Sequence, residues 1–237
     1  MPKVKFKYDL KKDAWSWVLI AKSQKRLAEL KKDWRKEVEF IPKELLDKIL
    51  KENSQRAEIL VYNHLISHPQ KLIRQLVIRE QLRSLEKVWR KIEKEFFRRL
   101  EQITKKPVFR KEFKCYLTTG FMCPYDPRDN SFMISMWHSI PWNITTICHE
   151  IFHLQFLYYY EKYCRKLISQ RKLDDLKEAL TFILDTDFKD LLISEDRGYP
   201  AHKELRKKLK EIWKKDKNFD RFLDKAIKIV KKTKIIN

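Results

Sequence analysis

Residues 145–156 read TTICHEIFHLQF, and at their centre His149 and His153 stand four residues apart, with Glu150 directly after the first histidine. On an α-helix, residues four apart lie on one face about one turn from each other, so both imidazoles can reach one metal ion. The flanking residues are mostly apolar, which favours a helix buried on its far side. The competing interpretation is a core helix whose two histidines are hydrogen-bonded to neighbouring groups.

Glu150 is expected to lie beside the metal without binding it. There its carboxylate can accept a proton from a metal-bound water and later pass that proton to a leaving amine. The pattern predicts metal-assisted hydrolysis of a carbonyl compound, most often a peptide bond. His64 and His68 share the same spacing, but Pro69 ends their helix and leucine occupies the position of the base, so we interpret that pair as structural.

A catalytic zinc ion needs a third protein ligand and an open fourth position. The next predicted helix, residues 174–186, carries Glu178 among apolar residues, where a carboxylate needs a partner. We expect Glu178 to be the third ligand, with Asp174 and Asp175 as alternatives; an ordinary solvent-facing glutamate is the competing interpretation. Asp185, two turns further on the same face, is expected to accept the outer N–H of a ligating histidine.

Such a site also needs a hydrogen-bond donor for the oxygen of the scissile carbonyl. Tyr199 and His202, which follow the turn residue Gly198, are the candidates for this catalytic role, and His138 is a weaker one. An aromatic side chain packed at a turn would explain Tyr199 equally well.

Hydrophobic periodicity predicts an α+β, mostly helical fold with a small antiparallel sheet packed on a long helix. The helix from about 70 to 104 has one continuous apolar face, and Asn143 is expected to cap the helix that carries the two histidines. The other predicted helices span residues 11–33, 42–67, 174–186, 201–215 and 218–232, and the predicted strands span 108–113, 115–121 and 131–137.

No glycine-rich or low-complexity linker divides the chain, which has only two glycines. We expect one compact unit made of three blocks. Residues 1–69 are a basic helical segment, residues 70–200 are the catalytic core, and residues 201–237 form basic C-terminal helices.

The motif His149-Glu150-x-x-His153, followed by a glutamate on a second helix, resembles the gluzincin branch of the zincin metallopeptidases, the thermolysin-like group, and especially its compact single-domain members. The resemblance covers about residues 70–190. It implies that His149, His153 and Glu178 bind Zn²⁺ and that Glu150 is the general base. It also implies that residues 70–104 are a backing helix and that 131–137 are the edge strand that holds the substrate.

The strand before the active-site helix has a physical reason to bind a peptide or protein substrate. An exposed edge could pair with an extended peptide and set its scissile carbonyl beside the metal. We therefore expect Phe132, Ile134 and Met136 to contact the substrate; a sheet edge covered by another segment is the alternative.

The chain carries 54 Lys and Arg residues against 33 Asp and Glu, a net charge of +21, distributed unevenly. Residues 1–112 have 30 basic and 16 acidic side chains (+14), residues 113–200 have 10 and 12 (−2), and residues 201–237 have 14 and 5 (+9). The block with the motif is therefore not built for polyanions. The basic ends, with tryptophans among lysines, make nucleic-acid binding the alternative function; those tryptophans are Trp15, Trp17, Trp34 and Trp213. A further alternative is a non-catalytic zinc-binding interaction protein.

The first residues, MPKVKFKYDLKKD, have no apolar core of a secretory signal, and no window approaches the roughly 18 apolar residues of a membrane span. The chain is therefore expected in the cytoplasm. Its four cysteines form no C-x-x-C pair and are expected to be reduced thiols.

Overall fold

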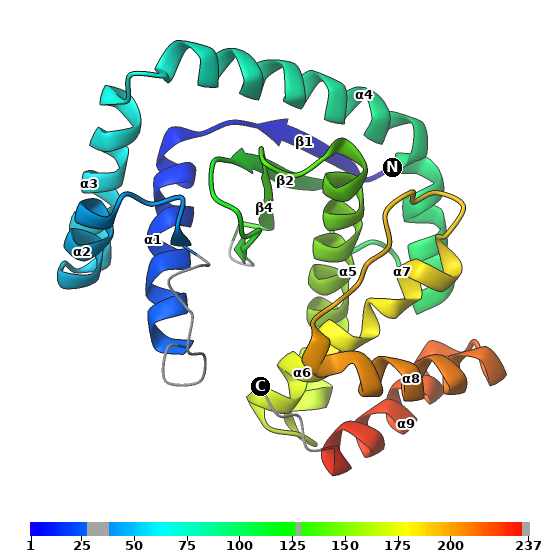
Figure 1. Ribbon diagram of the computed structural model, residues 1–237. Coiled ribbons are helices and arrows are strands. Elements are labelled where there is room, and N and C mark those ends of the chain that lie inside the picture. Colours follow the sequence, from blue (N-terminus) through cyan, green and yellow to red (C-terminus); the bar gives the residue numbers. More distant parts are fainter. Residues whose placement is uncertain (28–37, 127–128, 234–237) are drawn as a thin grey trace. The chain divides into compact units, whose positions relative to one another are not determined.

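A computed structural model describes residues 1–27, 38–126 and 129–233. Most of these residues are helical and four short strands among them form one sheet, so the expected α+β, mostly helical class is confirmed (Figure 1). The helices are α1 (Leu10–Leu27), α2 (Lys43–Lys51), α3 (Ser54–Ser67), α4 (Lys71–Thr104), α5 (Ile140–Arg165), α6 (Gln170–Leu180), α7 (Phe182–Asp187), the 3₁₀ helix η2 (Pro200–His202), α8 (Lys203–Lys215) and α9 (Phe219–Lys232). The strands are β1 (Lys3–Lys7), β2 (Glu112–Thr118), β3 (Tyr125–Asp126) and β4 (Ser131–Ser135).

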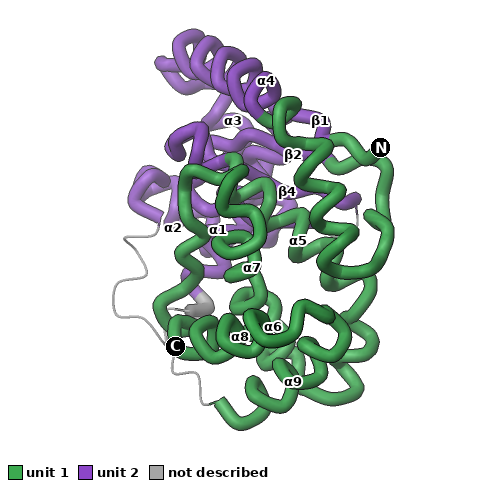
Figure 2. The backbone as a smooth tube through the Cα atoms, turned by 90° about the vertical axis from the view of Figure 1, so that its right-hand side faces the viewer, with its two compact units in different colours: residues 1–3, 89–113, 144–237 green, residues 4–88, 114–143 purple. Residues whose placement is uncertain are grey.

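The chain divides into two compact units (Figure 2). The first holds residues 1–3, 89–113 and 144–237, and the second holds residues 4–88 and 114–143. Helix α4 contributes to both. The boundaries of the two units differ from those of the three blocks expected from the sequence, and the three-block division stays a prediction.

In the second unit, α1, α2 and α3 pack side by side around an apolar cluster (Figure 1). The single helix predicted over 42–67 is two helices: α2 ends at Lys51, and Asn53 caps the start of α3, where its side chain accepts a hydrogen bond from the Arg56 amide at 3.0 Å. Of the helix predicted over 11–33, the part after residue 27 lies outside the described residues.

The sheet has the strand order β1-β2-β4-β3 and is mixed. Strand β4 pairs in parallel with β2 and antiparallel with β3, so the expectation of an antiparallel sheet is wrong. The residues between the predicted strands 115–121 and 131–137 are not a simple hairpin turn. They include β3, and the chain returns after β3 to run in the same direction as β2.

The expectation that residues 131–137 form an edge strand is also wrong. Strand β4 lies inside the sheet, with β3 on the side away from β2. Phe132 and Ile134 are fully buried, and Met136 follows the end of the strand, with its amide bonded to the Thr118 carbonyl at 2.9 Å. Their apolar side chains belong to the core or its margin, because both faces of this strand are covered.

Helix α5 begins at Ile140, three residues before the predicted cap. The hydroxyl of Ser139 accepts a hydrogen bond from the Trp142 amide at 3.3 Å, which is the geometry of an N-cap. Asn143 lies inside the helix instead and donates its side-chain amide to the Ser135 carbonyl at 2.8 Å. Although α5 is long and largely apolar, no helix in the described ranges is long and apolar enough to cross a membrane.

The helix predicted over 174–186 begins earlier, at Gln170, and breaks at Thr181 into α6 and α7. The Thr181 hydroxyl donates to the Glu178 carbonyl at 2.8 Å, which competes with the helical hydrogen-bond ladder. The two basic C-terminal helices form as predicted, and α6, α8 and α9 pack against one another. The apolar faces of α8 and α9 bury large side chains, including Trp213 in α8 and Phe222 in α9.

Asp13 anchors α1 to the end of β2 within the second unit. Its buried carboxylate accepts hydrogen bonds from the Thr119 amide at 2.8 Å and from the Tyr8 hydroxyl at 3.1 Å. Burial raises the pKa of Asp13 to about 6. Removing this carboxylate would leave buried donors without partners.

We predict that Asp13→Ala lowers the free energy of unfolding by roughly 3 kcal/mol. Asp9→Ala, which removes only the exposed cap that binds the Lys11 amide, should cost about 1 kcal/mol. Urea unfolding followed by circular dichroism measures both. Equal losses for the two variants would contradict the anchoring role.

Candidate metal centre

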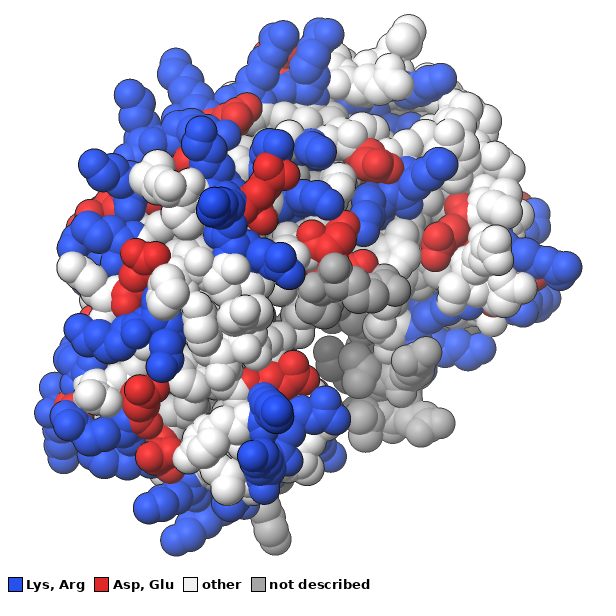
Figure 3. All heavy atoms as spheres, turned by 180° about the vertical axis from the view of Figure 1, so that it is seen from behind, with Lys and Arg blue, Asp and Glu red and all other residues white. Residues whose placement is uncertain are grey.

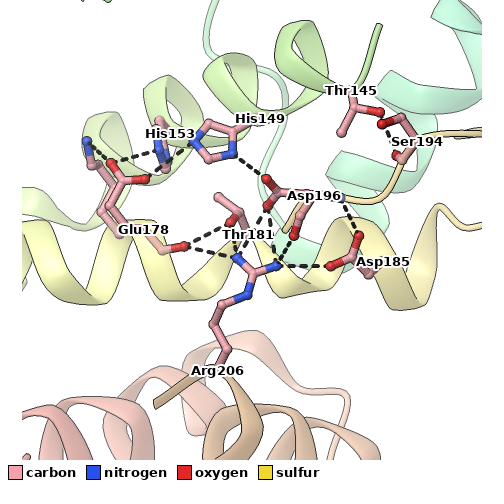
Figure 4. Close-up of polar contacts among 10 residues, drawn as sticks. Thr145, His149, His153, Glu178, Thr181, Asp185, Ser194, Asp196 and Arg206 are labelled. Carbon is pink, nitrogen blue, oxygen red and sulfur yellow. Dashed lines mark hydrogen bonds and ion pairs between the residues drawn. The ribbon is translucent and has the colours of Figure 1, made fainter. Parts of the chain in front are cut away.

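Three side chains from two helices of the first unit converge on one point (Figure 4). His149 and His153 come from α5 and Glu178 from α6, and one ligand atom of each lies within 4.8 Å of the others. The Nε2 atoms of His149 and His153 are 3.5 and 3.3 Å from the two carboxylate oxygens of Glu178. The structure therefore brings together the three residues that were expected to bind the metal.

The protonation states follow from burial and from the neighbouring charges. Burial lowers the pKa of His153 to about 3, aided by the charge of His149. Burial would also lower the pKa of His149, but the adjacent Asp196 carboxylate outweighs it and raises this pKa to about 10. Burial opposes the charge of Glu178, yet the two histidines hold its pKa well below the usual range. A carboxylate and one neutral imidazole are thus ready to bind a cation, while His149 must first lose a proton.

The outer partner of His149 is Asp196, and the expectation that Asp185 takes this role is wrong. The Nδ1 atom of His149 lies 3.1 Å from Oδ1 of Asp196, in the segment between α7 and η2. Asp185 instead accepts a hydrogen bond from the Asp196 backbone amide at 2.7 Å (Figure 4). Thr181 ends α6, so Asp185 belongs to α7 and does not share one continuous helix with Glu178. No periodic pattern in the sequence marks Asp196, which lies outside any helix.

Arg206 fastens the Asp196 segment to the two helices on either side of the break (Figure 4). Its guanidinium donates to the Thr181 hydroxyl at 2.7 Å and to Oδ2 of Asp185 at 3.0 Å, and also to the Asp196 carbonyl. The side chain is buried although it belongs to the basic helix α8. The sequence could have indicated a buried role for Arg206, because it lies on the apolar face of α8, beside Leu205 and Leu209.

Glu150 is buried beside this group, with 6% of the residue exposed. Burial raises its pKa to about 7; the charge of His149 opposes this rise, and the charge of Glu178 adds to it. Its Oε2 atom has no hydrogen-bond partner among the described residues. A carboxyl group that has a pKa near neutrality and an oxygen atom without such a partner is suited to accept and release protons.

Lys177 is a charged neighbour that the sequence pattern did not single out. Its Nζ lies 2.9 Å from Oε1 of Glu178, and the residue is buried. The sequence could have indicated its burial in the same way as for Arg206. Leu173 lies four residues before Lys177 and Leu180 three residues after it, so Lys177 lies on an apolar helix face.

The other expected residues are placed as follows. His202 is buried, and its Nε2 lies 3.2 Å from Oδ1 of Asp175, which therefore pairs with a histidine outside the ligand group. Asp174 is exposed and accepts a hydrogen bond from the Gln170 side chain. Tyr199 is 55% exposed, with its ring against that of His202. The roles of Tyr199 and His202 in catalysis stay predictions.

The remaining histidines make aromatic contacts in the second unit. His138 stacks on Trp142 with ring centroids 4.3 Å apart. His64 and His68 contact each other edge to face, and His68 is the residue that ends α3. Within the described residues, His149, His153 and Glu178 form the one cluster of this type that could hold a metal ion. Comparisons of the chain with protein-family models, curated proteins and solved structures found no match.

We predict that Arg206→Met lowers the free energy of unfolding by roughly 3 kcal/mol or more, because Asp185 and Asp196 lose the cation that matches their buried charges. Arg221→Met is the matched control: Arg221 is also paired with an aspartate, Asp216, but its side chain is 67% exposed, so the loss should stay below about 1 kcal/mol. Thermal and urea unfolding measure both. Losses of similar size would show that the Arg206 network does not hold this unit together.

Metal binding should release about one proton per ion at pH 8, because His149 is protonated there and must become neutral to bind. Asp196→Asn removes the charge that raises the pKa of His149, so fewer protons should be released. Titration calorimetry with Zn²⁺ in two buffers of different ionisation enthalpy measures this number. The same release from both proteins would contradict the assigned pairing.

Proposed function

We propose that the protein is a zinc-dependent metallopeptidase, a hydrolase that cleaves peptide bonds with Glu150 as general base. The observation that carries the proposal is the convergence of His149, His153 and Glu178 within 4.8 Å, with the Glu150 carboxyl group buried beside them. The resemblance to the gluzincin branch of the zincins points to the same reaction.

The donor set fits zinc. Two imidazole nitrogens and one carboxylate are the protein ligands of many catalytic zinc sites, and they leave a fourth position for water or substrate. Asp196 supports the fit because it fixes the orientation of the His149 ring and directs the opposite nitrogen toward Glu178. When bound, a zinc ion would lower the pKa of water and polarise a carbonyl group.

The protein side chains would supply the proton transfers. Glu150 would take a proton from the attacking water and deliver it to the nitrogen of the departing amine. Its pKa near 7 in the buried site suits both steps, since neither protonation state is strongly favoured at neutral pH. The substrate would be a peptide or protein, and its binding surface has to be sought away from a simple extension of β4, because that strand is flanked on both sides.

We place this activity in the cytoplasm. The cysteines support this: Cys115, Cys148 and Cys164 are buried thiols outside any disulfide. Unpaired thiols are typical of a reducing compartment.

Nucleic-acid binding is the alternative for the basic helices. Lysines at 203, 207, 210 and 214 follow one stripe of α8, beside its buried face. Figure 3, however, shows acidic side chains scattered among the basic ones on the face in view. Asp216, which directly follows α8, pairs with Arg221 of α9 and contacts Lys225 of the same helix. A solvated helix face explains these lysines, so the peptidase is the favoured function.

We predict that Glu150→Gln keeps one zinc per chain but lowers the rate of casein cleavage about 10²- to 10⁴-fold, because the amide cannot accept the proton. Glu161→Gln is the matched control: it makes the same change further along α5 on a side chain that is 42% exposed, and should leave the rate unchanged. Metal analysis and release of labelled casein peptides are the measurements. A Glu150→Gln protein with zinc and full activity would remove the proposed mechanism, and zinc without activity in the wild type would favour the non-catalytic alternative.

A further inference from the structure

Lys177 is the one buried lysine among those whose burial the structure describes. Lysine side chains normally extend their ammonium group into water, and burying such an ion costs several kcal/mol unless it is well paired. In a chain with 54 Lys and Arg residues, a single buried ammonium beside the candidate metal centre requires a specific explanation.

The ammonium lies next to the ligand group. Its Nζ is 2.9 Å from Oε1 of Glu178, and the same oxygen is 3.3 Å from Nε2 of His153. One carboxylate oxygen therefore separates the ammonium from a ligating imidazole. The charge of Lys177 also acts on Glu150, where it lowers the pKa against the effect of burial.

Charge accounting shows what this ammonium would do once a metal is bound. Arg206 lies between Asp185 and Asp196 and offsets part of their charge. Around the ligands, Glu178 and Glu150 supply two negative charges, against a divalent cation and Lys177. With Asp185, Asp196 and Arg206 included, the site would be neutral with Lys177 present and would carry one net negative charge without it. The ammonium therefore removes a repulsion against an anion in the open position.

We propose that Lys177 is the group that stabilises the negative charge on the carbonyl oxygen of the scissile amide. Water adds to the carbonyl carbon, its proton passes to Glu150, and the C=O electron pair moves to the oxygen, while the ammonium donates a hydrogen bond and keeps its protons. Lys177 would thus fill the role expected of Tyr199 and His202. This inference rests on the proposed peptidase function.

The test separates anion binding from metal binding and from activity. Co²⁺ is bound to the wild type and to three variants, Lys177→Met, Lys177→Gln and Lys177→Arg. Each protein is then titrated with phenylphosphonate, an anion, and separately with imidazole, a neutral ligand. Binding of either is measured from the change in the visible absorption of Co²⁺. Lys177→Gln retains a donor for Glu178 and covers the case in which the methionine variant does not fold. Lys166→Met is the control, since it removes the same charge from an exposed position.

We expect the methionine and glutamine variants to bind Co²⁺ as the wild type does, to bind phenylphosphonate at least about tenfold more weakly, and to bind imidazole with nearly unchanged affinity. Lys177→Arg should recover most of the affinity for the anion. On a fluorogenic peptide cleaved by the wild type, the neutral variants should show a lower kcat with little change in KM.

Equal phenylphosphonate affinity in all the proteins would overturn the proposal. So would loss of Co²⁺ from every neutral variant, because Lys177 would then be a positioning residue for Glu178. Failure of the peptidase function is distinguishable: the wild type would cleave no peptide and match Glu150→Gln, while the anion titration would still report on Lys177.

Discussion

The candidate centre depends on one carboxylate shared by three cationic or potentially cationic groups. Glu178 contacts His149, His153 and Lys177, and without it two imidazoles and an ammonium would meet in a buried pocket with no opposite charge between them. The helical repeat of α5 brings the two ring centroids within 4.2 Å of each other, but the third group comes from α6, through the contacts of Glu178 with both histidines. The arrangement is therefore a property of two helices held in register.

Further polar contacts, outside the group of Glu178 and the two histidines, connect the elements that carry these side chains. Asp196 contacts His149, and Arg206 connects the Asp196 segment with Thr181 and Asp185. Thr145, one turn before His149, donates its hydroxyl to the Ser194 carbonyl at 2.7 Å and fixes the same segment from the other end (Figure 4). The basic helix α8 is thus a structural part of the centre through one buried arginine, whatever its exposed lysines do.

The position of β4 changes what the resemblance to the zincins can mean for substrate binding. In the zincins the strand before the active-site helix is an edge strand. In this protein β3 pairs with the start of β4 at Ser131 and Phe132. A bound peptide would therefore need other contacts to align its backbone. If the proposed peptidase function holds, Lys177, which contacts Glu178, would be one such contact for the carbonyl group.

The sequence alone determined the elements that depend on local periodicity. Helices α4, α8 and α9 lie close to their predicted ranges, and the i, i+4 spacing placed His149 and His153 on one face because a helix has a fixed repeat. Glu178 was found because a carboxylate among apolar residues needs a partner. The direction of β4, the capping of α5 by Ser139 and the identity of Asp196 as the outer partner of His149 were decided only by the tertiary structure. The direction of β4 and the contact of Asp196 with His149 depend on groups far apart in the chain, and no repeat in the sequence records such contacts. The cap of α5 is a local contact, but the sequence offers both Ser139 and Asn143 for it, and Asn143 donates to the Ser135 carbonyl inside the fold instead.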